Sequence, residues 1–100
     1  MIYHKYKAVR TERNGIKFPS RKEARRYDEL VLLQKAGEVV MFLRQPLFDI
    51  GGGTTYKADF LVFWKDGHVG TEDIKGYKTK EFIKAKKQVE ALYPVEIEVK

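Results

Sequence analysis

Two neighbouring segments decide the fold: Thr55–Trp64, which reads TYKADFLVFW, and Val69–Lys75, which reads VGTEDIK. The first is almost continuously apolar and rich in aromatic residues, as expected of a buried strand. A short turn containing Asp66-Gly67 separates it from the second, so the pair is expected to form a central β-hairpin. Asp59 interrupts the apolar segment, where an unpaired carboxylate would cost several kcal/mol. We therefore expect Asp59 to have a partner.

The second segment supplies candidate partners for Asp59. Side chains alternate along a strand, so Asp73 and Lys75 share one face while Ile74 lies on the other. Two carboxylates and an ammonium on one face can hold a divalent cation and orient a water for attack on a phosphate. A purely structural Asp–Lys salt bridge explains the same residues, and the short pattern Asp-x-Lys does not by itself separate the two interpretations.

The length of the turn decides whether the two aspartates face each other. A two-residue loop makes paired residue numbers sum to 133 and puts Asp59 and Asp73 on opposite faces. A three-residue loop at 65–67, with Gly67 in the left-handed region, makes them sum to 132 and places Asp59 across from Asp73. A shared cation requires the second arrangement. We therefore predict a positive φ at Gly67, or a bulge within 60–72 with the same effect.

Capping residues and apolar spacing predict two helices around this hairpin. The first is expected from Arg21 to about Ala36, after an N-cap at Ser20. The remaining expected elements are a turn at 14–15 between extended pieces at 7–11 and 16–18, strands at 39–42 and 47–50, a glycine-rich hairpin tip at 51–54, a helix at 80–92 and a last strand at 95–99. We summarise this order as α-β-β-β-α-β, a mixed α/β fold in one domain over 1–100, with a flexible basic arm at 1–14.

Composition narrows the classes of function. The chain has 20 Lys and Arg against 14 Asp and Glu, for a net charge of +6, and it has no cysteine. Residues 1–26 carry +7, residues 27–75 carry −3 and residues 76–100 carry +2. An acidic centre between basic ends suits an enzyme that gathers a cation while binding a polyanion. The absence of an apolar N-terminal segment leads us to expect a cytoplasmic protein, in a bacterial host cell if it is encoded by a phage.

Four motifs together resemble a known superfamily. They are Asn14–Leu30 (NGIKFPSRKEARRYDEL), Gln45–Phe48 (QPLF), Tyr56–Phe60 (YKADF) and Glu72–Gly76 (EDIKG). The order of a helix Glu, a strand Asp and an Asp-x-Lys on the next strand is similar to the PD-(D/E)XK phosphodiesterases, which include restriction enzymes and Holliday-junction resolvases. The closer likeness is to small phage-borne proteins assigned as nucleases. The resemblance implies a restriction-endonuclease-like core.

The resemblance also implies roles for individual residues. Asp59 and Asp73 would be ligands of Mg²⁺, for which Mn²⁺ could substitute, and the Ile74 carbonyl would be a further ligand. Lys75 would orient the attacking water, and Glu23 would complete the catalytic site through a water or the metal. Glu23 also fits a capping box with Ser20, a purely structural role. Gln45 would be an accessory polar group.

Glu72, next to Asp73, is an alternative ligand, and the resemblance also indicates a substrate. Glu72 could replace Asp73 only if the strand register moved by one residue. The resemblance favours DNA as partner, branched as in a Holliday junction, and symmetric cutting would suit a homodimer. The rival hypothesis is a basic module that binds nucleic acid without cutting it. The candidate DNA-binding residues are Lys5, Lys7, Arg10, Arg13, Lys17, Arg21, Lys22, Arg25, Lys78, Lys80, Lys84 and Lys87.

Overall fold

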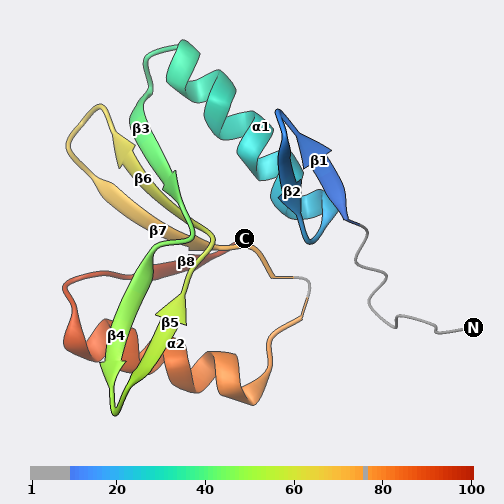
Figure 1. Cartoon of the computed structure of the whole chain (residues 1–100). Coiled ribbons are helices and arrows are strands. Elements are labelled where there is room, and N and C mark those ends of the chain that lie inside the picture. Colours follow the sequence, from blue (N-terminus) through green and yellow to red (C-terminus); the bar gives the residue numbers. More distant parts are fainter. Residues whose placement is uncertain (1–9, 76) are drawn as a thin grey trace, which may run out of the picture.

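The computed structural model describes residues 10–75 and 77–100 and has a mixed α/β architecture (Figure 1). The elements in chain order are β1 (Thr11–Arg13), β2 (Ile16–Phe18), α1 (Arg21–Lys35), β3 (Val39–Arg44), β4 (Leu47–Gly51), β5 (Thr54–Lys57), β6 (Phe60–Trp64), β7 (Val69–Asp73), α2 (Lys80–Leu92) and β8 (Ile97–Val99).

Both helices begin at the residues that capping chemistry predicts. The Ser20 hydroxyl accepts a hydrogen bond from the backbone N–H of Glu23, and the Thr79 hydroxyl accepts one from Phe82. Gly37 follows α1 with a φ of 82°, in the left-handed region that ends helices. Neither helix in the described part of the chain is long and apolar enough to cross a membrane.

The main sheet has four strands in the order β3-β6-β7-β8. Its first three strands are antiparallel, and β8 joins parallel to β7 after the crossover through α2. Phe60 and Val62 of β6 pack with α1 in one core cluster. Ile97 of β8 packs with α2 in a second cluster, from the opposite face of the sheet. The two helices therefore cover different faces, as Figure 1 shows.

The β6–β7 hairpin has the predicted register. Phe60 pairs with Glu72 and Phe63 with Val69, so paired numbers sum to 132. The loop at 65–67 is closed by a hydrogen bond of 3.0 Å from Gly67 N–H to the Trp64 carbonyl. Gly67 has a φ of 94°, which glycine adopts without the penalty that a side chain brings. The prediction of a three-residue loop is confirmed.

One expected strand is divided in two. Residues 54–57 form β5 and pair with β4, whereas residues 60–64 form β6 and pair with β3 and β7. Ala58 and Asp59 lie between these strands and outside both. Aromatic and apolar residues continue across the break, from Tyr56 and Ala58 to Phe60, so the apolar pattern does not reveal the change of pairing partner. Five strands therefore lie between the helices, where four segments were expected and the summarised order counted three, and β4 and β5 form a separate hairpin.

The N-terminal hairpin also differs from expectation. Residues 11–13 form β1 and pair with β2 around a turn at Asn14 and Gly15, both with positive φ. Arg13 Nε lies 3.0 Å from Asp28 Oδ2 of α1, which ties this hairpin to the helix. Residues 10–14 are thus part of the folded domain and not of a loose arm. Residues 1–9, which contain the rest of the predicted arm, lie outside the described residues.

Candidate active site

The structure brings together the four side chains that the motifs single out as catalytic. Glu23 projects from the first turn of α1, Asp59 precedes β6, and Asp73 ends β7 with Lys75 two residues beyond. Glu23 is 4% exposed and Asp73 is 1% exposed. The three carboxylates and the ammonium act on one another electrostatically, because Asp59 and Asp73 both raise the pKa of Glu23 and Lys75 lowers the pKa of both aspartates.

Asp59 is held by a backbone donor and by a second carboxyl. Its Oδ2 accepts a hydrogen bond of 2.7 Å from the Ile74 N–H, and its carboxylate accepts one from the Glu23 carboxyl. Burial, together with the adjacent Asp59 charge, raises the pKa of Glu23 from 4.5 to about 7. Burial also raises the pKa of Asp59, although the Ile74 N–H and Lys75 oppose that shift. Glu23 therefore keeps a proton where an isolated glutamate would have lost it.

Asp73 has different partners on its two oxygens. The Tyr56 hydroxyl donates a hydrogen bond to Oδ2. Oδ1 lies 3.2 Å from Lys75 Nζ as an ion pair, yet it is buried and has no well-aligned hydrogen bond within residues 10–75 and 77–100. Burial raises the pKa of Asp73, and Lys75 partly offsets this rise. Lys75 is itself positioned by α2, since its Nζ lies 4.8 Å from the centre of the Phe82 ring.

This donor set has the chemistry that a hard divalent cation requires. Mg²⁺ binds carboxylate and carbonyl oxygens, and Asp73 Oδ1 is a buried oxygen of this kind whose described contact is the Lys75 ammonium. Glu23 and Asp59 are two neighbouring carboxyls, and the Asp59 charge helps to keep a proton on Glu23 by raising its pKa. No three His, Asp or Glu side chains of the described residues already converge as a ligand set. The residues fit a cation that replaces the proton, with local adjustment of the carboxyl groups.

Glu72, the alternative to Asp73, lies on the other face of β7. It receives two hydrogen bonds from the Arg26 guanidinium, of 2.7 Å from Nε and 2.6 Å from Nη2. Such bidentate pairs are strong and geometrically specific. Glu72 is therefore held by α1 and does not take the place of Asp73, as the strand alternation predicts.

The motifs did not single out three neighbours of the site as functional. Tyr56 orients Asp73, Arg44 lowers the pKa of Glu23, and Lys57 lowers the pKa of Asp59. Arg44 lies 4.8 Å above the Phe18 ring, and its buried Nε has no hydrogen bond in the described part of the chain. Tyr56 and Lys57 directly precede Ala58-Asp59 in the chain, and this position in the motif could have indicated that they lie near the site. Nothing in the sequence points to Arg44.

The remaining predicted residues lie around the site with fewer contacts. Gln45 has a φ of 55° and donates its backbone N–H to the Asp59 carbonyl at 2.9 Å, so it fixes the backbone beside Asp59. Its side chain is exposed. Most of the predicted DNA-binding cations are exposed, and Arg13 is instead half-buried in its ion pair with Asp28. Lys5 and Lys7 lie outside the described residues. The exposed cations are Arg10, Lys17, Arg21, Lys22, Arg25, Lys78, Lys80, Lys84 and Lys87.

Comparison with known proteins gives a family and no activity. No curated protein matches the chain. A family model described as "Protein of unknown function (DUF1064)" matches residues 3–99, which is nearly the whole chain. The protein with this buried carboxylate cluster therefore belongs to the DUF1064 family.

Proposed function

We propose that this protein is a metal-dependent DNA endonuclease with a restriction-endonuclease-like core, acting on branched DNA of the Holliday-junction type. The observation that carries the proposal is that Glu23 in α1, Asp59 before β6 and Asp73 at the end of β7 act on one another electrostatically, with Lys75 acting on both aspartates. Buried carboxylates of the same sign raise the free energy of the fold unless a cation compensates them. Such an arrangement is expected where the cation serves a function.

The order of the elements supports the same proposal. When only the four-stranded sheet and the two helices are considered, the order is α1, β3, β6, β7, α2, β8. This is the α-β-β-β-α-β order that the motifs imply, and β4 and β5 are an inserted hairpin. The carboxylates lie where β6 begins and β7 ends, between the two helices.

Each residue of the site has a distinct task in this proposal. Asp73 Oδ1, Asp59 and Glu23 would hold Mg²⁺, with the Ile74 carbonyl as a further candidate ligand. Bound Mg²⁺ supplies Lewis-acid polarisation of the phosphate and a more acidic water. The Lys75 ammonium, fixed between Asp73 and the Phe82 ring, would stabilise negative charge that develops on the phosphate. Tyr56 keeps Asp73 in one orientation by holding its other oxygen.

The exposed cations are suited to the DNA backbone. Lys80, Lys84 and Lys87 recur along α2, and Arg21, Lys22 and Arg25 lie at the start of α1, next to Glu23. Cations that neutralise phosphates release counterions, so the logarithm of the binding constant should fall by about 0.9 per phosphate for each unit of log salt. We expect a slope of several units, and a flat salt response would contradict nucleic-acid binding.

A cleavage assay tests the activity directly. A labelled four-way junction and a linear duplex of the same sequence are incubated with the protein in Mg²⁺, in Ca²⁺ and in EDTA. We expect cutting of the junction in Mg²⁺, binding with poor cutting in Ca²⁺, and no cutting in EDTA. Full activity in EDTA would exclude the metal mechanism.

The rival function is a nucleic-acid-binding module that does not cut. The observation in its favour is the absence, among residues 10–75 and 77–100, of a ligand set already in place for a metal. This hypothesis predicts junction binding in all three solutions with no product in any of them. The same assay therefore separates the two functions.

A further inference from the structure

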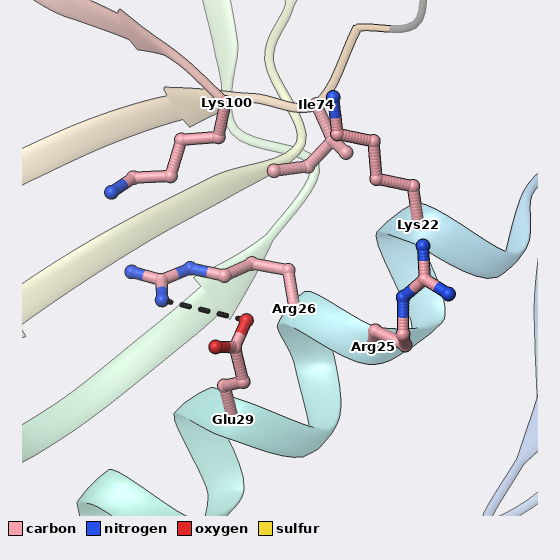
Figure 2. Close-up of a pocket in the computed structure, with 6 residues that line it drawn as sticks. All are labelled: Lys22, Arg25, Arg26, Glu29, Ile74 and Lys100. Atoms are coloured by element: carbon pink, nitrogen blue, oxygen red, sulfur yellow. Dashed lines mark ion pairs between the residues drawn. The ribbon is translucent and has the colours of Figure 1, made fainter.

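A basic pocket lies directly beside the candidate active site, on the α1 side of β7. Its volume is about 380 Å³, within the range of roughly 300–1,000 Å³ that is typical of ligand clefts. Figure 2 shows α1 forming one flank and the ends of the strands forming the other. The residues that line it are Lys22, Arg25, Arg26, Glu29, Ile74 and Lys100.

The cations that line this pocket differ in whether a nearby carboxylate already compensates their charge. Arg26 is paired with Glu72 and also lies 3.8 Å from Glu29, so its charge is already compensated. Lys22 Nζ donates only to a neutral carbonyl in the contacts described, and that bond leaves its charge free for an anion. Arg25 is exposed on the same helix. Lys100 Nζ lies 3.7 Å from Glu98, but both side chains are exposed, and an ion pair of this kind compensates a charge far less than the buried pair of Arg26 and Glu72 does.

The Lys22 ammonium and the backbone of Lys100 both contact the strand end that carries the site. Lys22 Nζ donates a hydrogen bond of 3.0 Å to the Lys75 carbonyl. The backbone of Lys100 lies alongside the same strand end, because its N–H donates to the Asp73 carbonyl at 2.9 Å and its carbonyl accepts from Lys75 N–H at 3.1 Å. Ile74, which lies between Asp73 and Lys75, forms part of the pocket wall. The pocket and the carboxylate cluster are thus two sides of one strand end.

From this juxtaposition we infer that the pocket binds a backbone phosphate of the DNA next to the phosphate that is cut, with its cations at Lys22, Arg25 and Lys100. This inference rests on the proposed endonuclease function and adds a subsite to it. Successive residues of a strand are about 3.3 Å apart, so a group at Ile74 lies one short step from Asp73 and from Lys75. A ligand of nucleotide size, whose negative charge is carried by phosphate, matches both the volume and the sign of the pocket.

The subsite is tested by removing its cations one at a time. Lys22→Ala, Arg25→Ala and Lys100→Ala are compared with Lys35→Ala, which removes an exposed lysine from the last turn of the same helix, away from the pocket. We expect each pocket variant to raise KM for junction cleavage about fivefold with kcat within twofold, and to lower the salt slope of binding by about one unit. Lys35→Ala should leave KM within twofold.

A second measurement locates the phosphate. After the cut is mapped, each flanking phosphate is replaced in turn by a neutral methylphosphonate. One replacement should weaken wild-type binding by the same factor as Lys22→Ala and should have no further effect on that variant. Equal losses in wild type and variant at both positions would overturn the subsite while leaving the nuclease function intact.

A third measurement does not depend on cleavage. Thymidine 3′,5′-bisphosphate is titrated into each protein and followed by NMR. Weaker binding to the pocket variants than to Lys35→Ala supports the subsite, even if no DNA is cut in Mg²⁺ and the proposed nuclease function fails. Equal binding to all four variants and wild type would overturn it.

Discussion

Glu72 and Asp73 are adjacent on β7 and each is 1% exposed, yet their surroundings are opposite. Glu72 faces α1 and receives two hydrogen bonds from Arg26, so its charge is matched by one guanidinium. Asp73 lies among Asp59 and Glu23, with Lys75 as the cation beside it. The first carboxylate is compensated inside the fold by a bidentate pair, whereas the second belongs to a cluster of carboxyl groups whose pKa values are raised by burial.

This difference distinguishes a carboxylate that stabilises the fold, Glu72, from one that is a candidate for function, Asp73. A bidentate pair raises the pKa of Arg26 and holds α1 against the sheet. Burial instead raises the pKa values of Glu23, Asp59 and Asp73, and the two aspartates raise that of Glu23 further, so each ionised form is penalised. Substitutions on the two sides of β7 should therefore have opposite consequences.

The largest effect is expected on cleavage. Asp73→Asn and Lys75→Ala should each lower the rate about a hundredfold or more, because they remove a proposed metal ligand and the cation beside the phosphate. Junction affinity should stay within a few-fold, since the phosphate contacts lie elsewhere. Product formation in Mg²⁺ and electrophoretic mobility shifts measure these quantities. Asp66→Asn, in the exposed hairpin loop, is the matched control, and a rate above a tenth of wild type for either variant would contradict the site.

The second effect concerns stability and tests the other side of β7. Glu72→Gln should lower the free energy of unfolding by about 3 kcal/mol, because the largely buried Arg26 guanidinium is left with only its longer, exposed contact to Glu29. Asp73→Asn should leave that free energy unchanged or raise it, since it relieves the penalty on a buried carboxylate. Denaturant unfolding followed by circular dichroism measures both.

A double variant serves as control for the Glu72 prediction. Arg26→Met combined with Glu72→Leu removes the pair without leaving a charge behind, and it should recover most of the lost stability. If Glu72→Gln and Asp73→Asn lower the free energy of unfolding by the same amount, the claim that the two carboxylates have different roles is wrong.

The third effect is a pH dependence that originates in Glu23. Its pKa is about 7 in the fold and 4.5 unperturbed, so the folded state binds more protons between these values. Stability should therefore fall as pH rises from 4.5 to about 7, by an amount on the order of 3 kcal/mol, and then level off. Melting temperatures between pH 5 and 8 in EDTA measure this fall.

Two changes should flatten that pH dependence. Glu23→Gln removes the titrating group. In the wild type, bound Mg²⁺ should displace the proton from Glu23. If the curve for Glu23→Gln coincides with that of the wild type in EDTA, the proton lies elsewhere.

The smallest effect is expected from the group that orients Asp73. Tyr56→Phe removes the hydroxyl that donates to Oδ2 and should lower stability by about 1–2 kcal/mol. It should also lower kcat several-fold with little change in KM, because Asp73 loses its fixed orientation. Tyr93→Phe is a matched control, since the Tyr93 hydroxyl donates to the Asp49 carbonyl. A change of kcat in both variants would show that the effect is not specific to Asp73.

Much of this arrangement could be predicted from local sequence. The caps at Ser20 and Thr79 fixed the starts of the helices, because side-chain acceptors at helix starts are determined within a few residues. Strand alternation allowed two registers of β6 and β7, and the requirement that Asp59 lie across from Asp73 selected the register observed, with Gly67 in the left-handed region.

What could not be predicted depends on contacts between distant residues. The division of 54–64 into β5 and β6 is a change of pairing partner, which the apolar pattern does not record. The pair of Arg26 and Glu72 joins residues 46 positions apart, and Arg44 reaches Glu23 from the end of β3. The sequence therefore predicted which carboxylates could form a site and the lysine beside them, but not the two further cations, Arg44 and Lys57.

The parallel pairing of β7 with β8 has a consequence for how the chain folds. β6 and β7 are joined by a short loop, and hairpins of this kind form within microseconds. β8 can pair only after α2 has crossed the sheet, and such non-local parallel pairings are slow. During folding, the hairpin thus brings Asp59 close to Asp73 before β8 is in place. The edge of β7 that β8 later covers is exposed in that interval and can pair with strands of other chains. We therefore expect aggregation to compete with folding mainly before residues 97–99 pair with β7.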